Sequence, residues 1–219
     1  QKKPLTSLLS DGKLFLHYGR LVVMFKLLLI FADPAEAART LSLFPFSLNK
    51  ENFYTYHTEN VLLDVMVLKT WGYRGVVQAL SPPPSGYDLW INAGFAGAAN
   101  PNIPLLKTYT ITSVKELTPT TSVEEELEVT PIPRLPLAQL TSVRSPYRDG
   151  FHEHLQLVDM EGFFIAKQAS LVACPCSMIK VSSDYTTREG QDFLKNNKVK
   201  LSQKLAEAIF PIYSSFIDV

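Results

Sequence analysis

The sequence predicts an α/β fold, a single domain of three αβα layers around a central twisted sheet that is mostly parallel and partly mixed. Two observations lead to this prediction. The chain has 219 residues, of which 46% are hydrophobic, and this is enough to bury one sizeable core. Apolar strands also alternate with helical patterns along the chain, an order that produces a parallel sheet with helices on both faces.

The first half of the chain begins with a strand and a helix. Residues 26–32 form a short apolar run, as expected for a buried parallel strand. Asp33 and Pro34 follow as an N-cap and a first helical residue, so a helix should begin here. Residues 61–68 carry apolar side chains at helical spacing, which favours a second helix. Residues 82–86 are rich in proline and predict a turn.

The middle of the chain contains a segment of small residues. Residues 88–92 predict a short strand, and residues 93–99 follow it with glycines and alanines that let a backbone approach a ligand closely. We therefore expect a ligand loop there. Residues 108–114 and 137–143 predict further strands, whereas residues 116–136, rich in Thr, Pro and acidic residues, predict exposed strands or a long loop.

The last third predicts a helix from Val158, ended by Cys174 and Pro175, then a strand over residues 178–182 and a final helix over residues 188–213. Ligands of such sheets bind at the carboxyl ends of the strands. Four features of the sequence follow strands in this way: Glu36, the glycines of residues 94–97, Glu161 and Asp184. Each acidic residue alone would more simply be a helix cap or a surface group.

Composition narrows the class of partner and the compartment. Lys plus Arg and Asp plus Glu are both 21, so overall charge favours neither a nucleic-acid nor a membrane partner. The two cysteines, Cys174 and Cys176, are too few and too close for a disulfide framework, which fits a reduced, cytoplasmic compartment. Residues 21–31 are apolar but interrupted and too short for a membrane span.

Met24 is a candidate natural start, so we expect residues 1–23 to be an extension and residues 24–219 to be the functional domain. Three further features are set aside. His152 and His154 with Glu153 lack a placed third metal ligand, Cys174 and Cys176 lack the spacing of a redox pair, and residues 124–126 form a solvated acidic face. We expect neither a metal nor a cofactor.

Two motifs in the last third carry a family resemblance. Val158-Asp159-Met160-Glu161-Gly162, followed by Ile179-Lys180-Val181-Ser182-Ser183-Asp184, resembles the signature of the nucleoside phosphorylase superfamily. The nearest branch is that of the methylthioadenosine/S-adenosylhomocysteine nucleosidases and futalosine hydrolases. Its Asn-x-Gly-x-Ala-Gly motif resembles residues 92–97, and its first strand with a following glutamate resembles residues 32–36. The resemblance extends from about Met24 to the C-terminus.

The resemblance implies a role for each of these residues. Cleaving a purine N-glycosidic bond requires an acid near N7, an activated water on the opposite face and a grip on the ribose hydroxyls. Asp184 resembles the acid, helped by Ser183, and Glu36 resembles the base. Glu161 resembles the glutamate that binds the ribose 2′ and 3′ hydroxyls, and Met160 packs under the sugar.

The remaining binding positions include two departures from the family. Ala96 and Gly97 match its glycine motif, but Phe95 replaces a serine or threonine, so a hydroxyl that places the water or the sugar is missing. Lys180 replaces an arginine and lacks its planar fork. Tyr147 is a candidate to stack on the base, with a surface tyrosine as the alternative. Relatives are commonly homodimers, and by analogy residues 103–106 could form that contact.

The resemblance therefore implies a hydrolase that releases adenine from 5′-methylthioadenosine, S-adenosylhomocysteine or, in bacteria that make menaquinone through it, 6-amino-6-deoxyfutalosine. A carboxylic acid suits a 6-amino purine, because it donates to N7 and accepts from the amino group. Asp33 and Glu36 would repel the phosphate that a phosphorylase needs. The alternatives are a futalosine hydrolase that releases hypoxanthine, and a nucleoside-binding module without turnover.

Overall fold

The structure is a computed structural model that describes residues 14–17, 20–117 and 125–217, with side chains described from residue 24 to residue 214 within these ranges. Four helices are described: α1 (Pro34–Leu41), α2 (Gly72–Leu80), α3 (Gly162–Leu171) and α4 (Gly190–Ile217). Within these ranges, no helix combines the length and the apolar character that a membrane span requires. Residues 124 and 218–219, and the beginning of the proposed extension, lie outside the described ranges.

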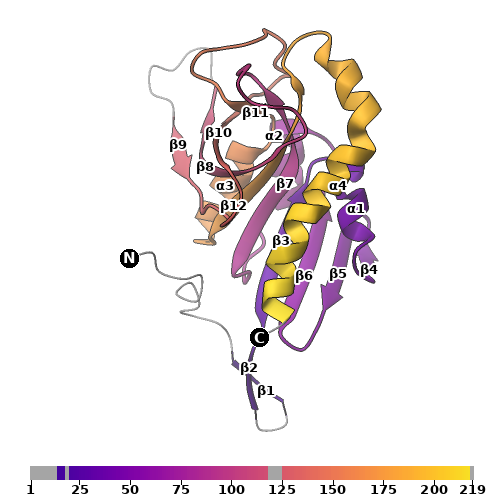
Figure 1. The fold of residues 1–219 in the computed structure, drawn as a ribbon. Helices are drawn as coiled ribbons and strands as arrows, with labels where there is room; N and C mark the ends of the chain where they lie inside the picture. The colour runs from indigo at the N-terminus through magenta and orange to yellow at the C-terminus, as the bar shows by residue number, and fades with distance from the viewer. Residues whose placement is uncertain (1–13, 18–19, 118–124, 218–219) are drawn as a thin grey trace.

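Ten of the described strands belong to one mixed sheet (Figure 1). In the order of the sheet they are β11 (Leu157–Asp159), β10 (Leu137–Ser142), β8 (Thr108–Glu116), β12 (Cys176–Tyr185), β7 (Leu89–Ala98), β3 (Phe25–Phe31), β6 (Val61–Val67), β5 (Phe53–His57) and β4 (Ser47–Lys50), with β9 (Glu126–Glu128) beside β8. β1 (Leu14–His17) and β2 (Arg20–Val23) pair only with each other among the described strands.

The central pairings are parallel. β3 runs parallel to β6 and β7, and β7 runs parallel to β12. The outer part is mixed, because β12 is antiparallel to β8 whereas β8, β10 and β11 are parallel to one another in turn. β11 also pairs antiparallel with β7, so β7, β12, β8, β10 and β11 pair in a ring. The prediction of a mostly parallel, partly mixed sheet is confirmed.

Helices cover both faces of the sheet, which confirms the three layers (Figure 1). α1 and α4 pack together on one face, and α2 and α3 pack on the other. Side chains of β3 alternate between the two cores, since Leu27 and Leu29 face α4 whereas Leu28 and Ile30 face α2 and α3. All four are buried. A strand covered on both faces is apolar throughout, as the sequence of this strand indicated.

One expected helix is wrong. Residues 61–67 form strand β6, which lies between β3 and β5. Because β6 is covered on both faces, apolar residues occur on either side of it and match a helical spacing by chance. Its polar residue, Asp64, is satisfied by neighbours, because it accepts hydrogen bonds from Thr55 Oγ1 at 2.5 Å and Tyr87 Oη at 2.6 Å.

Two element boundaries also differ from the prediction. The glycine segment is not a loop, because β7 continues through it to Ala98 with β12 and β11 as neighbours. The third helix begins at Gly162 instead of Val158, since Val158 belongs to β11. Helix α2 was not predicted, because Gly72 and Gly75 in its first turns weaken the helical pattern.

Candidate active site

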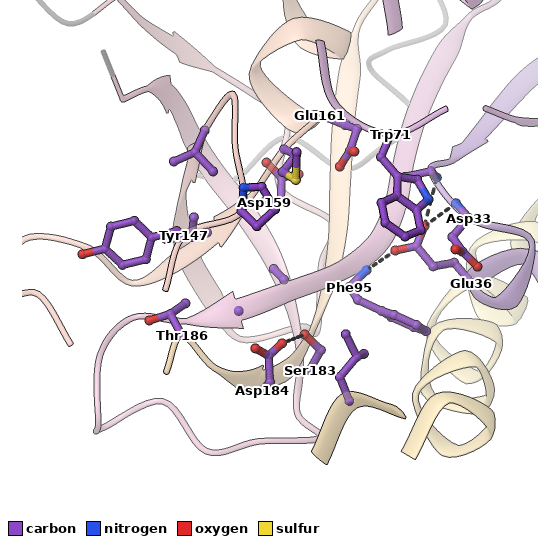
Figure 2. Close-up of a pocket in the computed structure, with 18 of the residues that line it drawn as sticks. Asp33, Glu36, Trp71, Phe95, Tyr147, Asp159, Glu161, Ser183, Asp184 and Thr186 are labelled. Carbon is purple, nitrogen blue, oxygen red and sulfur yellow. Dashed lines mark hydrogen bonds between the residues drawn. The ribbon is translucent and has the colours of Figure 1, made fainter. Parts of the chain in front are cut away.

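A pocket lies where the carboxyl ends of β3, β7 and β12 meet the first turns of α1 and α3. Nine of the ten predicted site residues line it: Asp184, Glu36, Glu161, Met160, Phe95, Ala96, Gly97, Ser183 and Tyr147. Figure 2 shows Glu36, Glu161 and Asp184 on different sides of the pocket. Residues 148 positions apart in the chain therefore converge at one edge of the sheet, counting from position 36 to position 184.

Glu36 is held by the start of helix α1. Its Oε2 accepts hydrogen bonds from the backbone N–H groups of Ala32 at 2.9 Å and Asp33 at 3.2 Å, while Asp33 caps the helix in return. This is a capping box, so the expected helix-cap role is present. The other oxygen, Oε1, accepts from the N–H of Phe95 at 2.7 Å (Figure 2). A carboxylate offers about four acceptor positions, and these three bonds leave one for a water.

The environment of Glu36 brings the ionisation of its carboxyl group close to neutral pH. Burial raises the pKa of Glu36 to about 7, although Lys180 and the N–H of Phe95 act in the opposite direction. Gly94 permits this arrangement, because a Cβ at that position would lie 2.9 Å from Glu36 Oε1. The absence of a side chain at Gly94 is therefore required for the carboxylate to reach β7.

Asp184 is buried at the end of β12, and only one of its two oxygens accepts a hydrogen bond from a described residue. Its Oδ1 accepts a hydrogen bond from Ser183 Oγ at 2.5 Å, whereas its buried Oδ2 has no hydrogen-bond partner among the described residues (Figure 2). Burial raises the pKa of Asp184, against the effects of the Ser183 hydroxyl and the Arg148 cation. A protonated Oδ2 could donate to a ligand at this position.

Glu161 occupies the N-cap position of α3 but makes no side-chain cap hydrogen bond there. Its Oε1 instead accepts from the backbone N–H of Gly72 at 2.6 Å, and its side chain reaches the pocket. Burial and the nearby Asp159 raise the pKa of Glu161 to about 7, against the Gly72 N–H and Lys180. Met160 lines the same wall, where Gly72 leaves room for its methyl group.

Lys180 is the one predicted site residue that does not line the pocket. Its side chain and that of Asp159 are each 1% exposed, and Lys180 Nζ lies 2.8 Å from Asp159 Oδ2. Asp159 also accepts from Ser142 Oγ at 2.5 Å and from the N–H of Gly162, the first residue of α3. The expectation that Lys180 contacts the ligand is therefore not supported, since the lysine is buried behind the pocket in an ion pair.

The glycine strand supplies backbone and small side chains to the pocket. Phe95 places its ring in the pocket, and the ring also packs against the core beneath α4. Gly97 lies close to Thr186, since a Cβ at position 97 would be 2.7 Å from the Thr186 methyl group. Tyr147 lines the pocket and packs beside Val143, so it is partly buried and is not a free surface tyrosine.

Several pocket residues were not found from the sequence, and four of them bring a large or charged side chain: Trp71, Arg148, Leu194 and Lys198. Arg148 Nη1 lies 3.7 Å from Asp184 Oδ2. Trp71 is 65% exposed at the start of α2, whereas Leu194 and Lys198 belong to α4. No local pattern marks these four, although Arg148 follows Tyr147 directly and could have been considered with it.

The features that were set aside lie elsewhere. His154 Nε2 lies 3.0 Å from Glu153 Oε1 on the surface, and Cys174 and Cys176 are free thiols. Among the described residues, no group of three or more metal-ligating side chains is assembled. Of the buried carboxylates among the described residues, Asp159 and the three predicted ones line the pocket, whereas Asp64 lies on β6 away from it.

Searches against models of protein families and against curated proteins return no match. Among solved structures, the chain is 97% identical to an MTA/SAH nucleosidase (MTAN) from Chlamydia trachomatis, with a TM-score of 0.85 over 88% of this chain and 100% of that one. The chain belongs to the MTAN family. The resemblance found in the sequence motifs is therefore confirmed.

Two further structures of the Chlamydia MTAN contain ligands. An aspartate-to-asparagine variant, 97% identical with a TM-score of 0.85, is bound to MTA, and another structure, 96% identical with a TM-score of 0.84, is bound to adenine. Both cover 88% of this chain and 100% of theirs. A futalosine hydrolase mutant of Helicobacter pylori has the same fold as this chain, with 14% identity and a TM-score of 0.70 over 89% of this chain and 99% of that one.

Proposed function

We propose that the chain hydrolyses the N-glycosidic bond of an adenine nucleoside and releases adenine. The candidate substrates are 5′-methylthioadenosine, S-adenosylhomocysteine and 6-amino-6-deoxyfutalosine. The observation that carries this proposal is the buried Asp184 Oδ2, which has no hydrogen-bond partner among the described residues and belongs to the same pocket as Glu36 and Glu161. The MTA and adenine bound to the Chlamydia MTAN support the same substrate class.

Asp184 is the proposed general acid. As the glycosidic bond breaks, negative charge develops on the purine, and a proton from Asp184 Oδ2 to N7 neutralises it. The raised pKa of Asp184 supports this role, because the acid must be protonated before it can donate. Ser183 orients the carboxyl group through its hydrogen bond to Oδ1.

Glu36 is the proposed general base. Its three backbone hydrogen bonds fix the carboxylate, and its remaining acceptor position can take a proton from water as the water attacks the anomeric carbon. Phe95 contributes its backbone N–H to this arrangement. The missing side-chain hydroxyl at position 95 therefore removes one contact to water or sugar, while the support of the base is retained.

Glu161 and Met160 are the proposed ribose-binding residues. Glu161 Oε1 accepts from the N–H of Gly72, but the carboxylate does not cap α3, so acceptor positions remain for the 2′ and 3′ hydroxyls. Ala96 and Gly97 have small or no side chains, so a sugar or base in the pocket can come close to the backbone of β7. Tyr147 is the proposed aromatic contact of the base, from the same part of the pocket as Arg148.

Hydrolysis is favoured over phosphorolysis by the charges at the first loop. Asp33 and Glu36 line the pocket there, and an anionic phosphate would be repelled by both. The pocket cations that the structure describes, Arg148 and Lys198, come from other elements, and Arg148 lies beside Asp184. Ribose 1-phosphate as a product would contradict this choice.

The identity of the base follows from the same carboxyl group. One oxygen of Asp184 donates to N7 and the other accepts from a 6-amino group, so the carboxyl group matches adenine. Hypoxanthine presents acceptors at both positions, so the second oxygen of Asp184 would have no donor to bind. The alternative, a futalosine hydrolase that releases hypoxanthine, shares the fold of this chain. The other alternative is a nucleoside-binding module, which would bind a nucleoside in this pocket without cleaving its glycosidic bond.

The decisive experiment measures base release from the three adenine nucleosides and from futalosine. We expect adenine from at least one substrate, and a fall of roughly a hundredfold or more for Asp184→Asn. Thermal unfolding of the variant controls for folding. Hypoxanthine alone would favour the futalosine hydrolase, and tight nucleoside binding without release of either base would favour the binding module.

We further propose a cytoplasmic bacterial enzyme that functions as a homodimer, with residues 24–219 as its domain. Trp71 supports a dimer, because this pocket residue is 65% exposed in the single chain and a second subunit would cover it. Ile103 of the expected contact is buried in its own core, so residues 104–106 remain for such a contact. Light scattering after size-exclusion chromatography would measure the oligomeric state, and a monomer would contradict the proposal.

A further inference from the structure

Arg148 and Asp184 lie next to each other in the pocket without being hydrogen-bonded. Arg148 Nη1 lies 3.7 Å from Asp184 Oδ2, a distance at which opposite charges attract but which is too long for a hydrogen bond. Asp184 Oδ2 and Arg148 Nε are both buried, and neither has a hydrogen-bond partner among the described residues. Buried polar atoms normally have a partner, so this pair has unused capacity to bind charge.

The loop that carries Arg148 is fixed to the strand that carries Asp184. The backbone N–H of Gly150 donates to the carbonyl oxygen of Thr186 at 2.9 Å, and Thr186 Oγ1 donates to the carbonyl oxygen of Gly150 at 2.7 Å. Gly150 has a φ of 84°, a left-handed conformation that favours glycine, so the chain can turn there. Arg148 Nη1 also donates to the carbonyl oxygen of Tyr147 at 2.9 Å. These bonds hold the guanidinium beside Asp184.

The proposed reaction moves negative charge across the pocket. As the bond between N9 and C1′ breaks, its electron pair passes to the purine, and the proton of Asp184 Oδ2 moves to N7. Water adds to C1′ and gives its proton to Glu36, so the products are neutral adenine and the free sugar. The reaction therefore begins with a carboxylate at Glu36 and ends with one at Asp184. The new carboxylate lies beside Arg148.

We propose that Arg148 is a positioning residue of the acid step, because its guanidinium stabilises the Asp184 carboxylate that forms when the proton moves to the purine. This inference rests on the proposed function, in which Asp184 is the acid. The interaction is stronger in the transition state than with the protonated carboxyl group, and only an interaction of this kind raises kcat. Arginine suits the role, since it keeps its charge at any pH at which the enzyme works.

Burial and Arg148 act on the same proton in opposite directions. Burial raises the pKa of Asp184 and keeps the proton in place before the reaction, whereas the Ser183 hydroxyl and Arg148 favour the carboxylate. Ser183 donates to Oδ1, while Arg148 lies near Oδ2, the oxygen that loses the proton. Without this cation, the buried carboxyl group would hold its proton more firmly and donate it more slowly.

A double-mutant cycle of Arg148→Met and Asp184→Asn tests this inference through the rate of base release. Each rate is measured at the plateau of that variant's pH profile, so that a shifted limb does not alter the comparison. When Asp184 is present, Arg148→Met should lower kcat roughly tenfold and leave KM within about twofold. In the Asp184→Asn background there is no carboxylate to stabilise, so Arg148→Met should lower kcat no further.

Two control variants accompany the cycle. Arg148→Lys keeps the charge and should regain most of kcat. Arg144→Met removes a surface arginine that is paired with Glu116 and lies outside the pocket, so it should leave kcat unchanged. Should Arg148→Met not fold, as judged by thermal unfolding, Arg148→Gln takes its place, because it also removes the charge and keeps a donor for the carbonyl oxygen of Tyr147.

An equal fall in kcat for Arg148→Met in both backgrounds would overturn the inference, because it would show that the arginine only shapes the pocket. A folded Arg148→Met enzyme with the wild-type kcat would overturn it as well. Absence of base release by the wild-type enzyme would instead count against the proposed function.

Discussion

Glu36 Oε1 accepts a hydrogen bond from the backbone N–H of Phe95 at 2.7 Å, and this bond joins the first turn of α1 to the central strand β7. The two residues are 59 positions apart in the chain. The bond depends on Gly94, because any side chain there would occupy the place of the carboxylate. A backbone position thus controls the geometry of the proposed base.

Gly94→Ala should remove most of the activity while the fold is retained. The added Cβ would lie 2.9 Å from Glu36 Oε1, so the carboxylate must move away from the Phe95 N–H. We expect kcat to fall by roughly a hundredfold, as for the loss of a general base. Steady-state kinetics and thermal unfolding would be measured together. Activity near that of the wild type would show that the Glu36–Phe95 bond is not needed.

Glu36→Gln should change how stability depends on pH. Because the pKa of Glu36 is raised from 4.5 to about 7 in the folded protein, the folded state binds this proton more tightly than the unfolded state. The contribution to stability is complete below about pH 4.5 and is lost as pH rises to about 7. The wild type should lose up to roughly 3 kcal/mol more than the variant across this range. Urea unfolding at several pH values measures the difference, and parallel curves would contradict it.

Arg148→Met should shift the basic limb of the activity profile. The Arg148 guanidinium lies 3.7 Å from Asp184 Oδ2 and holds the pKa of Asp184 below the value that burial alone would produce. Without this cation, Asp184 should keep its proton to higher pH, so the basic limb of kcat/KM should move upward. Arg148→Lys, which keeps the charge, is the matched control. A basic limb that stays in place would argue against Asp184 as the acid.

Trp71→Ala should weaken substrate binding without changing the ionisation of the site. Trp71 lines the pocket but makes no side-chain hydrogen bond at the N-cap of α2, so its removal should leave that helix intact. We expect KM to rise roughly tenfold from the lost apolar contact, with the limbs of the pH profile unchanged. Tyr73→Ala, a neighbouring aromatic residue that does not line the pocket, is the control. An equal rise in KM for both variants would show that weaker binding results from a disturbed helix α2 and not from a lost contact with Trp71.

Much of the fold follows from local patterns. The apolar strand at residues 25–31, the Asp33 cap and the long final helix are evident in the sequence because burial on both faces and helix capping leave local signatures. Strand β6 was mistaken for a helix because a fully buried strand has no distinctive period. Helix α2 is not evident in the sequence because it contains Gly72 and Gly75, which disfavour a helix. Packing of α2 against α3 stabilises the helix in the folded protein.

The site divides in the same way. The sequence alone determined the acidic residues at the strand ends, Glu36, Glu161 and Asp184, since each lies within a motif or at a helix start that can be recognised locally. Only the tertiary structure decided that Lys180 is withdrawn into an ion pair with Asp159, and that Arg148 lies beside Asp184. Burial and the pairing of charges depend on residues brought together from distant parts of the chain, and local sequence does not specify which partners will meet.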